Sequence, residues 1–445
     1  MNLRNLLSLG KSPVSLTEGQ LNYLENVRCW ADIYSGNTPW QFARKGGLQG
    51  GMRKISALGA ARSLCSEMAA LCFSQQIDIA ADSEQCTAYI EKTLQENGFW
   101  RCFPLFLERM FAEGAGIVKV YSEKGRPKLD FLPAQCFVPT QYDEKGVYGG
   151  FIISCRTEKE TEYVLLEEHR KEKDGYLIRN KLFRFKNGSY KETDLEELYP
   201  DLAAETFIEG LEKPLFTYFR PAGAGEGALG KSVFSAAVDT LKSLDVVFDS
   251  LEREFVLGRK RIIVPCSAIR GEYDRKGNLV KYFDPNDEVY QAFSADDNEE
   301  LKIIDNSAEL RVEQHTQALT ELLDLLCMQV GLSQGALSYH GSTAKTAAEV
   351  ISRNSKTYRT KTAHQQLIRE GLLEVIDNLL LMGMKSGEVP CTHCKVTIVF
   401  ADSVAQDNSQ KIDNALKLYN AGIISKERAV MEIYGIDKSQ AEGGV

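Results

Sequence analysis

Two long amphipathic helices, separated by a short insert, constrain the fold of this chain more than any other feature. The first carries apolar residues three and four apart through three heptads and is predicted to end at Gly258. These residues are Phe234, Ala237, Leu241, Leu244, Phe248, Leu251 and Phe255. Because an α-helix has about 3.6 residues per turn, this spacing places them on one stripe that needs a partner. A second such helix is predicted at 309–330, so the pair flanks residues 259–308.

A third long helix is predicted at 346–385, after a connection at 331–345 that is rich in glycine and serine. The first half of this helix is polar and basic, with Arg353, Lys356, Arg359 and Lys361. Its second half carries apolar residues at spacings of four and three. This change along one helix predicts that its second half lies in the core, while its first half faces a polar surface.

The rest of the chain mixes helices and strands. Apolar spacing predicts a helix from Met52 to about Phe73, whereas 117–187 shows short strands separated by charged turns. Further strands are expected at 216–219 and 395–400, and a helical pair from about Ser409. Turns rather than helical crossovers join the strands at 117–187, so the predicted class is α+β with a largely antiparallel sheet.

The composition excludes some functions. Lys and Arg total 53 against 62 Asp and Glu, which gives a net charge of −9. A protein that coats DNA is normally basic, because neutralising phosphates supplies most of its non-specific affinity. No segment approaches the roughly 18 apolar residues of a membrane helix, and the N-terminus lacks the apolar core of a signal peptide. We therefore expect no membrane association.

The eleven cysteines are scattered from Cys29 to Cys394, which predicts a chain made in a reducing cytosol with its thiols as small core residues. The spacing Cys391-Thr-His-Cys394 can begin a zinc site. A closed zinc site needs four ligands, and no second pair at usable spacing follows. We therefore predict no metal, no cofactor and no catalytic residue.

One motif suggests a nucleotide-binding site. Residues Gly225, Gly230, Lys231 and Ser232 match the phosphate-loop pattern at every fixed position. Such a loop works because its backbone N–H groups and a helix N-terminus hold phosphates, while the Lys and Ser reach a phosphate and magnesium. Pro221 interrupts the strand before it, and the alternation of strands and helices that builds a parallel sheet is absent. A P-loop NTPase that uses Gly225–Ser232 is therefore the alternative function.

The order of elements resembles the portal protein of tailed bacteriophages, specifically the siphophage portals of Gram-positive hosts. The stretches that carry the resemblance are Trp30–Gly36 with Lys54–Phe73, Gly230–Phe234 before the heptads at Leu244, Lys345–Thr360, and Asn420–Glu427 with Gly435-Ile436. Of these, Lys345–Thr360 is the most similar to the family. Residues 120–215 match only loosely, and the chain is short for the family after its third helix.

The resemblance implies a portal-type fold with named parts. Residues 1–230 would form the wing or body, 231–258 the first stem helix, 259–308 a small α/β clip, and 309–330 the second stem helix. The connection 331–345 would be a tunnel loop, 346–385 the long wing and crown-side helix, and 386–445 the C-terminal wing with a short crown. Four residues of the loop would face DNA in the channel: Gln334, Ser338, His340 and Lys345.

The resemblance also implies a mechanical function without enzymatic activity. Twelve copies would form a ring at one vertex of the capsid, which serves as the channel for genome packaging and ejection. The ring would dock the large subunit of the terminase and later a head-completion (adaptor) protein, beside the major capsid protein or scaffold. Double-stranded DNA would pass through non-specifically. Such a protein is assembled in the host bacterial cytoplasm and ends in the virion.

Two questions stay open at this stage. The basic stretch Arg353, Lys356, Arg359 and Lys361 would face DNA, an acidic surface of a neighbouring subunit, or solvent. The heptads would also suit an α-helical scaffold protein that forms a coiled-coil dimer or trimer. That class does not need the strand-rich half or the insert between the two helices, so it ranks behind the portal and the NTPase.

Overall fold

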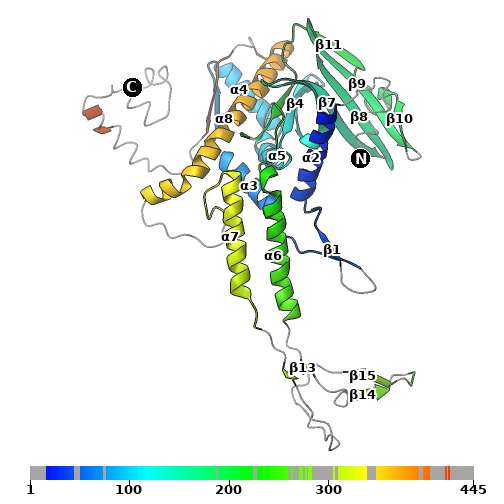
Figure 1. Ribbon diagram of the computed structural model, residues 1–445. Helices are drawn as coiled ribbons and strands as arrows, with labels where there is room; N and C mark the ends of the chain where they lie inside the picture. The colour runs from blue at the N-terminus through cyan, green and yellow to red at the C-terminus, as the bar shows by residue number, and fades with distance from the viewer. Residues whose placement is uncertain are drawn as a thin grey trace, which may run out of the picture. The chain divides into compact units, whose positions relative to one another are not determined.

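The computed structural model (Figure 1) describes most of the chain. The described residues are 17–44, 51–73, 77–186, 189–223, 228–258, 262–263, 270–273, 276–277, 279–282, 304–305, 309–337, 347–389, 394–400, 416–417 and 419–420. The chain divides into two compact units. The first unit comprises Met1–Pro39, Gly59–Leu241 and Leu323–Val445, and the second comprises Trp40–Leu58 and Lys242–Leu322.

An aromatic core organises the first unit around helix α5 (Phe99–Glu113). The rings of Phe99 and Phe103 stack with their centroids 4.7 Å apart, and Phe103 meets Phe219 edge-on at 5.7 Å. Phe99 and Phe103 are both fully buried. Helices α2 (Glu18–Tyr34), α3 (Ala60–Cys72) and α4 (Glu84–Glu96) contact α5. Burial of large aromatic side chains therefore holds these helices together.

Two antiparallel sheets complete the strand-rich part of the first unit. One has the order β12 (Phe216–Phe219), β4 (Gly116–Glu123), β5 (Arg126–Pro133). The strands of the larger sheet are β6 (Phe137–Tyr142), β7 (Val147–Glu158), β8 (Thr161–Lys171), β9 (Gly175–Lys186), β10 (Ser189–Thr193) and β11 (Glu205–Glu209). Neighbours in sequence pair from β6 to β10, and β11 also pairs with β9. The prediction of an α+β fold with antiparallel sheets is confirmed.

The last long helix joins distant parts of the first unit. Helix α8 (Ala347–Ser386) contacts α3, α4, β4 and β12. After it, strand β17 (Val396–Phe400) pairs antiparallel with β3 (Ile77–Ala81). Ile368, Leu372, Val375 and Leu379, in the second half of α8, are each at most 1% exposed. The apolar spacing of that half therefore did predict its burial.

The second unit contains a small hairpin and parts of two helices. Strands β1 (Phe42–Arg44) and β2 (Met52–Lys54) pair antiparallel. Helix α6 (Val238–Leu257) begins in the first unit and ends in the second. Helix α7 (Val312–Val330) begins in the second unit and ends in the first. Between them, β13 (Ile262–Ile263) pairs with β16 (Ile304–Asp305), and β14 (Arg270–Tyr273) pairs with β15 (Leu279–Tyr282). The insert therefore begins and ends on one pair of strands.

Three predicted element boundaries were wrong. Helix α3 begins at Ala60 and not at Met52, because Met52–Lys54 pairs with β1 and Gly59 adopts a left-handed conformation with φ 72°. Helix α6 begins at Val238, after a 3₁₀ turn at Ser235–Ala237. Helix α7 begins at Val312 rather than 309. The helical pair from Ser409 lies mostly outside the described residues.

Candidate functional site

The apolar stripe of α6 is buried at its start and exposed at its end. Leu244 is fully buried and Leu241 is 3% exposed, and Phe234, just before the helix, is also fully buried. Phe255, at the other end of the same stripe, is 50% exposed. Further exposed apolar side chains of the second unit lie on both helices or beside them: Val246, Val256, Leu310 and Val312. Where such exposed apolar side chains form a contiguous patch, they mark a surface that binds another protein.

Side-chain hydrogen bonds join the two helices. In the second unit, Arg311 binds Glu254 through two nitrogens, at 3.0 and 2.9 Å, and the hydroxyl of Ser250 lies 3.1 Å from Nε2 of His315. Hydrogen bonds from Arg311 lower the pKa of Glu254 to about 2. Glu254 pairs with Arg311, and Ser250, one turn earlier in the sequence, pairs with His315, one turn later. The helices are therefore antiparallel, as the predicted out-and-return path requires.

Two aspartates on α6 hold the β1–β2 hairpin. Asp249 accepts two hydrogen bonds from the guanidinium of Arg53, at 2.5 and 2.7 Å, and one from the backbone N–H of Ser56 at 3.1 Å. Asp245 accepts from the indole of Trp40 at 2.8 Å and from the backbone N–H of Leu58 at 2.9 Å. Both aspartates are 6% exposed.

The charge of Arg53 also acts on its partner. Hydrogen bonds from Arg53 lower the pKa of Asp249 below its ordinary value. The sequence did not reveal this contact, because Arg53 and Asp249 are nearly two hundred residues apart. The sequence feature that points to a bound partner is the pair Asp245 and Asp249, two acidic residues one turn apart on α6 beside an apolar stripe.

The start of the predicted tunnel loop is anchored to α8. The backbone N–H of Ser333 donates to the hydroxyl of Thr357 at 2.8 Å, and the hydroxyl of Thr360 donates to the carbonyl of Gly331 at 2.7 Å. Gln334 lies in an exposed turn just beyond. The other predicted DNA-facing residues are Ser338, His340 and Lys345, which lie outside the described residues. Their assignment stays a prediction.

The four basic residues of α8 do not form one exposed face. Lys356 donates to the backbone carbonyl of Met328 at 2.6 Å, near the C-terminal end of α7, where cations are favourable. Lys361 is 3% exposed, so its side chain is not available to DNA or a neighbour. Arg359 is exposed, whereas the side chain of Arg353 is not described. Whether the exposed Arg359 faces DNA or a neighbouring subunit stays a prediction.

The described end of the phosphate-loop motif, from Gly230 to Ser232, is packed against the backbone of its own chain. Gly225 lies outside the described residues, but Gly230 packs so closely that a Cβ there would lie 1.9 Å from the carbonyl oxygen of Gly114. The hydroxyl of Ser232 is buried and donates to the backbone carbonyl of Phe111 at 3.4 Å. The preceding strand β12 pairs antiparallel with β4. A phosphate loop instead follows a parallel strand directly and opens a helix.

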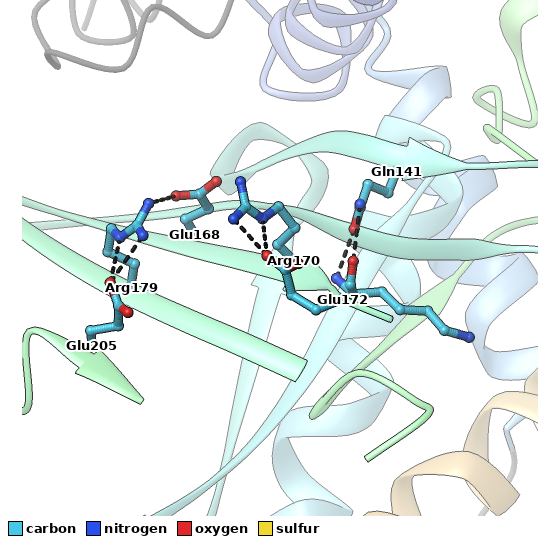
Figure 2. A network of polar contacts seen from close by, with 7 residues as sticks. Gln141, Glu168, Arg170, Glu172, Arg179 and Glu205 are labelled. Carbon is cyan, nitrogen blue, oxygen red and sulfur yellow. Dashed lines mark hydrogen bonds and ion pairs between the residues drawn. The ribbon is translucent and has the colours of Figure 1, made fainter. Parts of the chain in front are cut away.

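A polar network covers the edge of the larger sheet (Figure 2). Arg179 on β9 lies between Glu168 on β8 and Glu205 on β11, at 3.3 and 2.9 Å, and Arg170 binds Glu172. Arg170, Glu172, Arg179 and Glu205 border a hollow of about 380 Å³. Each arginine already has a carboxylate partner, so the network has little charge left for a ligand. Exposed pairs of this kind contribute at most about 1 kcal/mol each.

One cysteine prediction needs correction. The structure joins Cys86 on α4 to Cys394 just before β17 by a disulfide, whereas the scattered cysteines predicted thiols only. Cys391 and His393, the other members of the suggested zinc spacing, lie outside the described residues. Among the residues that are described, no three metal-ligating side chains cluster. Nor does any helix in that part of the chain have the length and apolar character to cross a membrane.

Comparisons with known proteins identify a family. The family model described as "Phage portal protein, SPP1 Gp6-like" matches residues 51–443. No curated protein matches the sequence. A similar solved structure is titled "Neck of native GTA particle computed with C12 symmetry"; it is 12% identical, and the match covers 84% of this chain and 88% of that one. Its TM-score of 0.39 is too low to establish a shared fold.

Proposed function

Because the chain belongs to the SPP1 Gp6-like family of phage portal proteins, we propose that it forms the ring at one vertex of the capsid through which the genome is packaged and ejected. The observation that carries this proposal, beside the family, is the pair of antiparallel helices with exposed apolar side chains. A single chain leaves Phe255, Val256 and Val246 about half exposed to water. Neighbouring copies in a ring would cover them.

The parts of the ring follow from the predicted divisions. Helices α6 and α7 form the stem, and the insert 259–308 forms the clip that docks the terminase and then the head-completion protein. The connection 331–345 forms the tunnel loop, while 1–230, 346–385 and 386–445 form the wing and short crown beside the capsid protein. Twelve copies close the ring, the number expected from the family resemblance.

The charge of the chain suits a conduit for DNA. A net charge of −9 disfavours tight binding to phosphates, so DNA slides rather than adheres. In this proposal the energy for packaging comes from the ATPase of the separate terminase. The portal itself supplies a closed wall and docking surfaces in the virion.

The native mass of the purified full chain tests the proposal. We expect mass photometry to show one dominant species near twelve times 49.7 kDa at two protein concentrations in moderate salt. Negative-stain images of that species should show a ring with a central channel. A species of two or three chains that persists at both concentrations would contradict the proposal and favour the coiled-coil scaffold.

A further inference from the structure

The β1–β2 hairpin has two different faces. Opposite residues in its register are Phe42 with Lys54, Ala43 with Arg53 and Arg44 with Met52. Because side chains alternate along a strand, Ala43 and Arg53 share one face, whereas Phe42, Met52 and Lys54 share the second. Arg53 binds Asp249 of α6, so its face is the one directed to the helix of its own chain.

The second face, which we call the outer face (Phe42, Met52 and Lys54), is exposed and apolar in part. Phe42 is 51% exposed and Met52 is 61% exposed, and Lys54 is also exposed. Two strands of three residues are marginal by themselves, so a hairpin of this size depends on what packs against it. Its own α6 supports one face only.

The charges of the hairpin and the helices are opposite. Residues 40–58 contain Arg44, Lys45, Arg53 and Lys54 and no acidic residue. Helices α6 and α7 together carry eight acidic and two basic residues. The acidic residues are Asp239, Asp245, Asp249, Glu252, Glu254, Glu313, Glu321 and Asp324. The contact between Arg53 and Asp249 already shows within one chain that this hairpin binds this type of helix surface.

We propose that the outer face of the hairpin docks on helices α6 and α7 of a neighbouring copy of the chain. The inference rests on the proposed ring. A closed ring needs a heterologous interface, in which one surface of each copy meets a different surface of the next. The outer face supplies one surface. The exposed Val246, Phe255 and Val312 supply the other, together with acidic side chains of the two helices that are exposed, such as Glu313. Each hairpin then links the helices of two adjacent subunits.

Photo-crosslinking with mixed isotopes tests the contact directly. A photoreactive benzoyl-phenylalanine is placed at position 42 or 52 of the full chain, and unlabelled and ¹⁵N-labelled chains are mixed before assembly. We expect cross-links from these positions to peptides of α6 or α7 that join a light chain to a heavy chain. Rings whose cross-links stay within one chain, or reach another surface, would overturn the inference and leave the ring itself intact. Failure of the unmodified chain to form rings would instead reject the proposed function and this inference with it.

A pair of substitutions gives an independent test with a matched control. Phe42 on β1 and Phe207 on β11 are both strand residues and both 51% exposed. We expect Phe42→Ser to raise the concentration needed for ring assembly by roughly tenfold, which corresponds to about 1.4 kcal/mol at the interface. Phe207→Ser should leave assembly unchanged. Lys54→Glu should act like Phe42→Ser, because it reverses a charge that faces acidic helices. Equal effects of the two phenylalanine variants, or none, would contradict the docking.

Discussion

At the scale of single residues, a buried ion cluster between the two sheets of the first unit shows how charges are kept in the core. Glu167 on β8 is 7% exposed and binds Nζ of Lys119 on β4, at 3.0 Å, and Nε2 of His169 at 2.6 Å. Burial alone would raise the pKa of Glu167, but the hydrogen bond from His169 and the charge of Lys119 outweigh it and lower that pKa to about 2. A carboxylate placed in this way makes the stability of the fold depend on pH.

The sign of that dependence follows from the direction of the shift. A carboxyl whose pKa falls from 4.5 to about 2 on folding stabilises the native state fully above pH 4.5. This contribution, about 3 kcal/mol, is lost as the pH falls from 4.5 toward 2. We expect Glu167→Gln to remove that part of the acid dependence, measured as the free energy of unfolding in urea between pH 6 and pH 3. Parallel pH curves for the variant and the parent would contradict the assignment.

A position can require glycine because its backbone has a positive φ or because a Cβ would collide with a neighbour, and two glycines of this chain allow these reasons to be tested separately. Gly114 and Gly125 have similar positive φ values of 85° and 79°. A Cβ on Gly114 would lie 2.5 Å from a backbone carbon of Lys231, whereas a Cβ on Gly125 meets nothing within 4 Å. We expect Gly125→Ala to cost about 1 kcal/mol from backbone strain alone. Gly114→Ala should cost more than about 3 kcal/mol, because two backbones must also move apart. Thermal unfolding of both variants measures the difference, and equal losses would argue against the close contact.

At the scale of elements, the hairpin is fixed to its own helix by two aspartates rather than by an apolar core. Its strands have three residues each, and of these the side chain of Arg53 makes the contact with Asp249. Elements held by few contacts open more readily than the rest of a fold. The contact between Arg53 and Asp249 should therefore control how often the hairpin detaches.

Asp249→Asn tests this contact. The substitution keeps the shape of the side chain but removes the charge that Arg53 binds, at an expected loss of about 1.5 kcal/mol or more in the docking of the hairpin. Limited trypsin digestion of the unassembled chain should cut within residues 40–58 roughly tenfold faster. Asp377→Asn, at an exposed site on α8 in the first unit, is the control. Unchanged cleavage at 40–58 would show that other contacts hold the hairpin.

At the scale of the whole molecule, the proposed portal function gives the phosphate-loop motif no catalytic role. Lys231 is exposed, but Gly230 and Ser232 on either side of it are packed against the C-terminal end of α5. We expect the purified chain to hydrolyse no ATP above background and Lys231→Ala to assemble like the parent. Measured phosphate release that disappears in Lys231→Ala would instead support the NTPase.

Local periodicity determined what can be known from this sequence alone. Heptad-like spacing predicted the two stem-like helices and the apolar second half of α8, and short strands separated by turns predicted the antiparallel sheet. Each of these signals depends on neighbours a few residues apart. The order of these elements also pointed to the portal family, and the family model agrees.

Only the tertiary structure decided the features that join distant residues. The pairing of Met52–Lys54 with β1, the capture of Arg53 by Asp249, and the disulfide between Cys86 and Cys394 left no local pattern. The burial of Lys361 is of the same kind, since a lysine in a polar stretch is normally exposed. The physical reason is that burial and ion pairing between distant residues can outweigh the local preferences of the sequence. Which residues are buried or paired depends on which surfaces meet when the chain folds.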